Sequence, residues 1–121
     1  MDSTNIGLFG EDMACRYLRS IGLSVITRNF RTKFGEIDII AQDTSGLLLI
    51  LEVKTRRTSS GFPFLPEDNF TSQKRRRVNR MAEYYVAKHP DLLTAAGWRV
   101  DLIAIEVVDA NKINLRHYKN A

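Results

Sequence analysis

Two short runs of almost wholly apolar residues constrain the fold of this chain more than any other feature. They are residues 37–41, where only Asp38 is polar, and residues 47–51, and the segment 43–46 between them has the composition of a tight turn. The strands predicted around them, 36–42 and 47–54, would form a β-hairpin. A strand with one face in water alternates apolar and polar residues, and these runs do not. We therefore expect a sheet that is covered on both faces.

Helical periodicity flanks this hairpin. Residues 8–22 predict a first helix, which could begin near residue 4, with a buried stripe and a stop at Gly22. A second helix is predicted from residue 70 or 71 to about residue 88. The first stripe consists of Ala14, Cys15, Leu18 and Ile21, and the second of Val78, Met81, Ala82, Tyr85 and Val86.

Three more strands complete the predicted elements, at residues 24–31, 98–108 and 112–118. The order is then αβββαββ, and the expected fold is α/β, a central mixed β-sheet flanked by helices. The length of 121 residues suits a single domain, 1–121. Residues 55–69 are rich in Thr, Ser, Gly and Pro, which predicts a flexible, exposed loop.

Composition excludes several classes of protein. The longest wholly apolar stretch has five residues, far short of the ~20 that span a bilayer, and the first residues show no secretory signal. A single cysteine, Cys15, leaves no internal disulfide and no cysteine-cluster metal site. His89 and His117 are too far apart in sequence to indicate zinc. We expect a cytoplasmic protein with no membrane association.

Four charged residues stand where a core is predicted. Glu11 lies ~60° from Ala14 on the helical wheel, inside the apolar stripe. Asp38 interrupts an apolar strand, while Glu52 and Lys54 close another and share a face because they are two residues apart. These four residues are the candidate catalytic group.

The hairpin register relates three of them. If the turn centres on residue 45, Asp38 faces Glu52 with Cβ atoms ~4.5–5.5 Å apart, although a slip of one residue would change this. Facing carboxylates repel, and Mg²⁺ or Mn²⁺ would compensate them. Lys54 would then approach a phosphate or a metal-bound water. The same register also allows an ordinary cross-strand pair of Lys54 with Glu36, and Glu11 could be a boundary residue that reaches solvent.

The basic residues are concentrated after this hairpin. Residues 54–80 contain eight Lys and Arg and two acidic residues, a net +6 in a chain of net +4. On the second helix Lys74 lies ~40° from Val78 and should point toward the sheet, while Arg75 lies near the edge of the stripe. Arg76 and Arg80 face away. A solvated surface and contact with DNA both suit the run of Arg76, Arg77 and Arg80. Phe62 and Phe64 could stack on unpaired bases or anchor the loop.

At this point the chain resembles a known family. The segments that carry the resemblance are Gly10-Glu11-Asp12, Tyr17-Leu18, Arg28-Asn29-Phe30-Arg31, Gly35-Glu36-Ile37-Asp38-Ile39-Ile40-Ala41, Glu52-Val53-Lys54-Thr55-Arg56, Lys74 and Arg99-Val100-Asp101-Leu102-Ile103-Ala104-Ile105. In this order they resemble the YraN-like family of small bacterial proteins, which is similar to the PD-(D/E)XK, restriction-endonuclease-like superfamily and closest in pattern to archaeal Holliday-junction resolvases.

The resemblance implies a restriction-endonuclease-like sheet and a Mg²⁺-dependent nuclease site. By matched position, Glu11 resembles the helix carboxylate, Asp38 the motif aspartate, Glu52 and Lys54 the E-x-K pair, and Lys74 the basic residue of the next helix. The chain departs from the pattern in two places. Arg75 stands where the family often has Gln, and Ile37 stands where the superfamily motif has Pro.

Together these observations predict an endonuclease that hydrolyses DNA with Mg²⁺ or Mn²⁺, with branched or structured DNA as a candidate substrate. Asp38, Glu52 and Glu11 are the predicted metal ligands, Lys54 the group that positions water or phosphate, and the backbone contacts are Arg56, Arg57, Lys74 and Arg75. The alternatives are a non-catalytic nucleic-acid-binding module that retains the fold and a protein-interaction domain. Junction resolution would favour a symmetric dimer, although the sequence carries no clear dimer signature.

Overall fold

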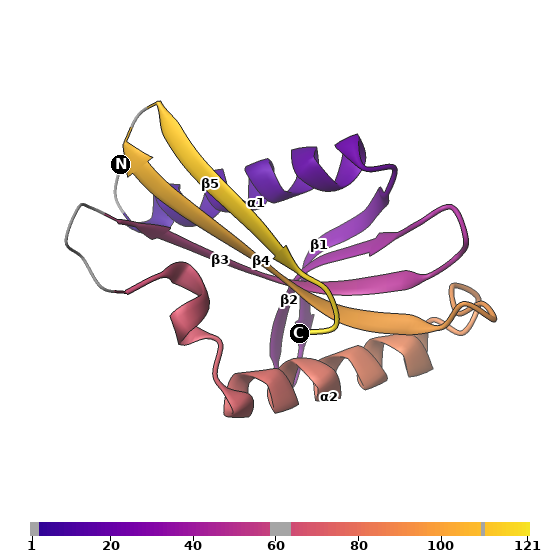
Figure 1. Ribbon diagram of the computed structural model, residues 1–121. Coiled ribbons are helices and arrows are strands. Elements are labelled where there is room, and N and C mark those ends of the chain that lie inside the picture. Colours follow the sequence, from indigo (N-terminus) through magenta and orange to yellow (C-terminus); the bar gives the residue numbers. More distant parts are fainter. Residues whose placement is uncertain (1–2, 59–63, 110) are drawn as a thin grey trace.

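The computed structural model describes residues 3–58, 64–109 and 111–121. Apart from one short 3₁₀ helix, the elements follow the predicted order αβββαββ (Figure 1). They are α1 (Ser3–Ser20), β1 (Ser24–Thr32), β2 (Gly35–Gln42), β3 (Leu48–Arg57), the 3₁₀ helix η1 (Pro66–Asn69), α2 (Ser72–Lys88), β4 (Trp98–Asp109) and β5 (Lys112–Tyr118).

The strands form one mixed sheet in the order β1-β2-β3-β4-β5. Strands β3 and β4 are parallel, and the other neighbouring pairs are antiparallel. A parallel pair needs a crossover connection, and α2 lies in that connection. Figure 1 shows α1 and α2 on opposite sides of the sheet. The predicted fold class, a central mixed sheet flanked by helices, is confirmed.

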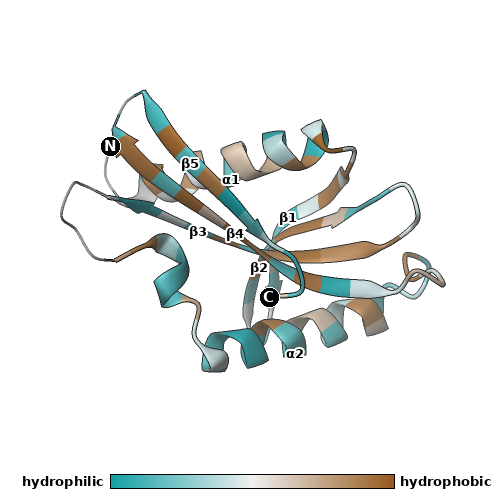
Figure 2. Ribbon diagram, in the orientation of Figure 1, coloured by the Kyte–Doolittle hydropathy of each residue, from teal (hydrophilic) through white to brown (hydrophobic). Residues whose placement is uncertain are grey.

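Each helix closes one half of the core. Ala14, Cys15 and Leu18 of α1 pack with Ile39 and Leu51 on one face of the sheet. On the other face, the core of α2 residues and strand residues consists of Val78, Met81, Ala82, Tyr85, Ile37, Ile40, Leu48, Ile50 and Val100. Figure 2 shows the hydrophobic colour concentrated along the middle strands. Burial on both faces accounts for the uninterrupted apolar runs.

The predicted hairpin register is confirmed where the two strands pair. The pairs are Ile39 with Leu51, Ile40 with Ile50, Ala41 with Leu49, and Gln42 with Leu48. In the turn, one carboxylate oxygen of Asp43 accepts hydrogen bonds from the backbone N–H groups of Ser45 at 2.9 Å and Leu47 at 3.0 Å. Gly46 has φ of 93°, a conformation that favours glycine.

Two local predictions were wrong. The stripe of α1 does not include Ile21, because the helix ends at Ser20 and the Ile21 side chain is 48% exposed. The predicted loop over 55–69 is shorter, because β3 continues through Arg57 and Pro66–Asn69 form η1. Phe62 lies outside the described residues. None of the helices in the described ranges is long and apolar enough to cross a membrane.

Candidate active site

The candidate site lies where β2 and β3 stop pairing with each other. Their register ends at Ile39 and Leu51, although β2 begins at Gly35 and β3 continues to Arg57. Just beyond the last pair, Asp38 Oδ2 accepts a hydrogen bond of 2.8 Å from the backbone N–H of Val53. The carboxylate therefore takes the place of a backbone partner in the ladder. This fixes Asp38 between two diverging strands.

The strand that carries Asp38 also changes face at this residue. Ile39 packs on the α1 side of the sheet, whereas Ile37 packs on the α2 side, although residues two apart normally share a face. On β1, the pairs Arg28–Ile39 and Phe30–Ile37 flank the corresponding position, Asn29, which has φ of 54°. The irregularity in both strands orients Asp38 toward β3, and simple alternation does not predict it.

Asp38 and Glu52 crowd each other. Burial and, second, the charge of nearby Glu52 raise the pKa of Asp38 to about 8, against the hydrogen bond from the N–H of Val53, which lowers it. Asp38 thus stays protonated at pH values at which an ordinary aspartate is ionised. A bound cation would instead favour the ionised form of Asp38.

Lys54 pairs with Glu52 and not with Glu36. Its Nζ lies 3.3 Å from Glu52 Oε1, with the two side chains 25% and 14% exposed. Glu36 instead lies 3.6 Å from Arg31 Nε. The alternative of an ordinary cross-strand pair between Lys54 and Glu36 is therefore wrong. Asp38, Glu52 and Lys54 form one cluster, called here the fork site because it lies where β2 and β3 diverge.

Glu11 reaches the fork site from α1 because the preceding residue is glycine. A Cβ on Gly10 would lie 2.7 Å from Thr55 Cβ of β3, so only glycine permits this approach of helix and strand. The Glu11 side chain is 17% exposed. Burial and then the charge of Asp38 raise its pKa. Glu11 is thus not a boundary residue that reaches solvent, and it lies near enough to Asp38 for their charges to interact.

Two residues that the sequence reasoning did not assign hold Glu11 in place. Arg28 Nη2 lies 3.5 Å from Glu11 Oε1, and Arg28 Nη1 lies 3.0 Å from Asp12. With its amide nitrogen oriented as the donor, Asn29 donates to Glu11 Oε1 at 3.0 Å and to Glu36 Oε1 at 2.8 Å. Both residues stand in a segment that carries the family resemblance. Their roles depend on contacts across the fold, and no local pattern reports these.

The predicted DNA contacts lie in different surroundings. Lys74, in the first turn of α2, is half-buried, as expected for a side chain directed at the sheet. Arg75 is exposed and lines a pocket of about 220 Å³ together with Glu67 and Tyr118. Arg56, near the end of β3, lies over the ring of Phe64 at 5.5 Å, and Arg57 is exposed.

The metal-ligand set is only partly assembled. Across residues 3–58, 64–109 and 111–121, no group of three or more His, Cys, Asp or Glu side chains is placed to hold a metal ion. Asp38 and Glu52 are the carboxylates that crowd each other, whereas Glu11 is held by Arg28 and Asn29. Glu11 as a third ligand stays a prediction.

Fold and site together define a mixed α/β protein with a carboxylate–lysine cluster at a fork in its sheet. The chain belongs to the uncharacterised protein family UPF0102, whose family model matches residues 10–105. The resemblance to YraN-like proteins is thereby confirmed.

Relatives in this family match most of the chain. A UPF0102 protein of Roseiflexus castenholzii is 37% identical over 115 residues, which cover 94% of this chain and 90% of the relative. One of Coxiella burnetii is 44% identical over 100 residues, covering 83% and 80%. Among solved structures, an EndoMS–dsDNA complex has a TM-score of 0.45 at 15% identity and covers 75% of this chain and 32% of that chain.

Proposed function

We propose that the protein is a metal-dependent endonuclease that hydrolyses phosphodiester bonds in branched or structured DNA. The observation that carries the proposal is the fork site, where Asp38, Glu52 and Lys54 converge although two carboxylates repel each other there. Strongly perturbed carboxylates are typical of functional sites because folding alone does not favour them. The cytoplasmic location predicted from the sequence is part of the same proposal.

The donor set fits a hard divalent cation. Mg²⁺ is usually held by one or two carboxylates together with water and substrate phosphates, so Asp38 and Glu52 would suffice without a third side chain. The raised pKa of Asp38 is compatible with this fit, because a bound cation would favour the ionised carboxylate that burial and the charge of Glu52 disfavour. Glu11 would act as a further ligand or through water. When bound, Mg²⁺ or Mn²⁺ would activate water and neutralise charge on the phosphate.

The side chains of the fork site have separate roles in this proposal. The hydrogen bond from Val53 N–H holds the Asp38 carboxylate in one orientation. Lys54, 3.3 Å from Glu52, can donate to the attacking water or to a phosphate oxygen while its own position is held by that carboxylate. Contacts to the DNA backbone would come from Arg56, Arg57, Lys74 and Arg75.

A second candidate is a non-catalytic nucleic-acid-binding module. The observation in its favour is that no three ligand side chains in the described part of the chain are grouped for a metal. Both candidates predict DNA binding that weakens with salt. Only the nuclease predicts that DNA is cut.

The test is a cleavage panel with the purified protein. Linear duplex, nicked, flapped and four-way DNA are incubated with Mg²⁺ or Mn²⁺, or with EDTA. We expect the protein to cut DNA when Mg²⁺ or Mn²⁺ is present and not in EDTA. The cleavage rate should fall by at least about 100-fold in Glu52→Gln and in Lys54→Gln. Glu83→Gln is the matched control, because Glu83 is exposed on α2, and it should cut at the wild-type rate.

Thermal unfolding of each variant separates lost chemistry from lost folding. If no substrate is cut with either metal, or if Glu52→Gln cuts as fast as the wild type, the endonuclease proposal is wrong. Retained DNA binding without cutting would then favour the binding module.

A further inference from the structure

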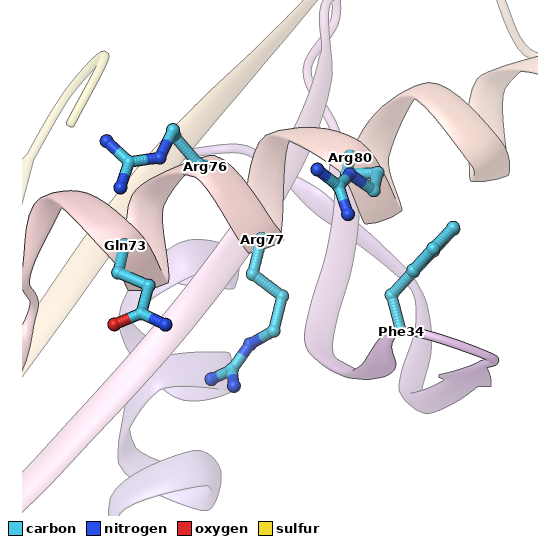
Figure 3. Close-up of a pocket in the computed structure, with 5 residues that line it drawn as sticks. All are labelled: Phe34, Gln73, Arg76, Arg77 and Arg80. Carbon is cyan, nitrogen blue, oxygen red and sulfur yellow. The ribbon is translucent and has the colours of Figure 1, made fainter.

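A second surface, separate from the fork site, is hollowed between α2 and the turn that joins β1 to β2. It is a groove of about 400 Å³, lined by Phe34, Gln73, Arg76, Arg77 and Arg80. Figure 3 shows the glutamine and the three arginines projecting from α2 and Phe34 rising from the turn beside Arg80. We call this surface the arginine groove.

The charges of the arginine groove are not neutralised by the protein. Within the described ranges, Arg76, Arg77 and Arg80 form no salt bridge, whereas Arg28, Arg99 and Arg116 each have a carboxylate partner. Arg76 and Arg80 stand four residues apart on one helix, where like charges destabilise it. The three side chains also lie exposed. Such a cluster costs stability unless an anion relieves the repulsion.

An aromatic ring lies among these charges. Phe34 is half-buried and packs against the core on the α2 side, which holds it in place. The guanidinium of Arg80 lies 5.4 Å from the ring centroid, and Lys33 Nζ lies 5.2 Å from it. A cationic groove with an aromatic side chain is the combination by which proteins hold single-stranded nucleic acids, because phosphates meet the cations and bases stack on the ring.

We propose that the arginine groove binds a single-stranded segment of DNA, with its phosphates on Arg76, Arg77 and Arg80 and a base against Phe34. Arg76 and Arg80 are separated by ~6 Å along the helix axis, which is comparable with the spacing of successive phosphates in one strand. Bases in a duplex are stacked inside it and do not reach such a ring. The inference rests on the proposed function in one respect, that the ligand is DNA.

The position of the groove relates it to the fork site. Phe34 directly precedes β2, the strand that carries Asp38, and the arginines share α2 with Lys74, which is half-buried. A strand held in the groove therefore lies beside α2 and the start of β2, the strand that carries Asp38. The unpaired arm of a flap or fork is the part of a structured substrate that this groove suits.

The test measures binding without cutting. Fluorescence anisotropy in EDTA compares a labelled oligothymidylate with a blunt duplex of equal length, using the full chain and variants. Arg76→Gln/Arg80→Gln should weaken single-strand binding by about tenfold or more and should reduce the salt slope by ~1.4, that is ~0.7 for each of two phosphates. The charge-matched control is Arg16→Gln/Arg19→Gln, which removes two exposed arginines of α1, and it should have a much smaller effect.

Phe34→Leu tests the stacking separately. It should weaken binding of the single strand several-fold, with an unchanged salt slope and unchanged duplex binding. Thermal unfolding checks that each variant is folded. An oligouridylate that bound tenfold more tightly than the oligothymidylate would overturn the choice of DNA.

Three other results would overturn the inference. They are a groove variant that binds the single strand as the wild type does, a loss equal to that of the α1 control, and an equal loss for duplex and single strand. These outcomes are distinguishable from failure of the nuclease proposal. If the protein cuts no DNA but the Arg76→Gln/Arg80→Gln variant loses single-strand binding, the groove inference stands and the nuclease proposal is wrong.

Discussion

The acidic residues of this protein occupy two contrasting environments. At the fork site, Asp38 and Glu52 stand together, and the pKa of Asp38 rises to about 8 because of burial and the charge of Glu52. On β4, by contrast, Asp101 is fully buried and yet ionised. It accepts hydrogen bonds from Arg99 at 2.7 and 2.9 Å and from the N–H of Asn120 at 2.9 Å. These bonds, with His117, hold its pKa well below the usual range, against the opposing effect of burial.

Glu67 of η1 belongs with Asp101. It accepts hydrogen bonds from Arg116 Nη2 at 2.9 Å and from the hydroxyl of Tyr118 at 2.6 Å, and the bonds from Arg116 lower its pKa to about 2. In this second environment, each carboxylate stabilises the fold because it has cationic and neutral donors. At the fork site, by contrast, burial and the charge of Glu52 disfavour the ionised form of Asp38. The cation of the proposed metal site would supply the partner that Asp38 lacks.

The largest effect is expected from Asp101→Ala. The change leaves the guanidinium of Arg99 and the ring of His117 without their shared acceptor in a buried position. The free energy of unfolding should fall by about 3–5 kcal/mol, measured by urea denaturation. Asp91→Ala, at an exposed position, should change it by less than about 0.5 kcal/mol. Equal losses for the two variants would contradict a structural role for Asp101.

Next in size is Gly10→Ala. The added methyl group would overlap Thr55, so α1 must move away from β3 and Glu11 must leave the fork site. We expect a loss of about 1–3 kcal/mol in the free energy of unfolding and reduced cleavage in the DNA panel. Gly7→Ala is the matched control in the same helix. Nothing lies within 4 Å of its added Cβ, and the better helix propensity of alanine should stabilise the protein by about 0.5–1 kcal/mol.

Asp38→Asn should increase the free energy of unfolding, unlike the preceding substitutions Asp101→Ala and Gly10→Ala. The asparagine oxygen can still accept from Val53 N–H, while the amide can donate to Glu52 and the repulsion disappears. The folded state holds the Asp38 proton up to about pH 8, whereas the unfolded chain releases it near the ordinary value of 3.8. Wild-type stability that is present at low pH is therefore lost as the pH rises through this window.

The variant lacks this loss. It should be more stable than the wild type by at least about 1 kcal/mol at pH 8 and nearly equal to it at pH 4, as followed by thermal unfolding across that range. A variant that is less stable than the wild type at pH 8 would show that the carboxylate of Asp38 stabilises the fold after all.

The smallest effect is expected from Glu67→Gln. Because Arg116 is 32% exposed, solvent screens the pair, and the loss at pH 7 should be about 1 kcal/mol. The folded pKa is lowered from 4.5 to about 2, so the contribution is present above pH 4.5 and is lost as the pH falls through about 2. Melting curves at pH 7, 4 and 2 measure it. A difference that grew toward low pH would overturn the contrast between Glu67 and Asp38.

The sequence predicted those features that depend on local pattern. The composition and position of the turn were sufficient for the hairpin register, in which Ile39 faces Leu51. Helical spacing was sufficient to place Cys15, Leu18 and Tyr85 in the core. The same pattern failed at Ile21, because a helix end is set by the turn that follows it, and Gly22 has φ of 92° in that turn.

The sequence predicted which residues form the candidate site but not how they are arranged. Charge in an apolar stripe was enough to select Glu11, Asp38, Glu52 and Lys54. That the ladder ends before Asp38 could not be seen, because it depends on a side chain that replaces a backbone partner of Val53. The support of Glu11 by Arg28 and Asn29 joins α1 to β1 and has no signal in local periodicity.

The early end of the β2–β3 ladder has a mechanical consequence. The two strands share four register pairs, whereas β3 and β4 share ten and the β1–β2 hairpin has a ladder of its own. The β1–β2 hairpin and the rest of the sheet are therefore two parts joined by the four register pairs between β2 and β3. A rotation between these two parts would change the separation of Asp38 and Glu52 only by stretching the hydrogen bond from Val53 N–H to Asp38. The spacing of the two carboxylates therefore depends on one side-chain hydrogen bond and not on the backbone ladder.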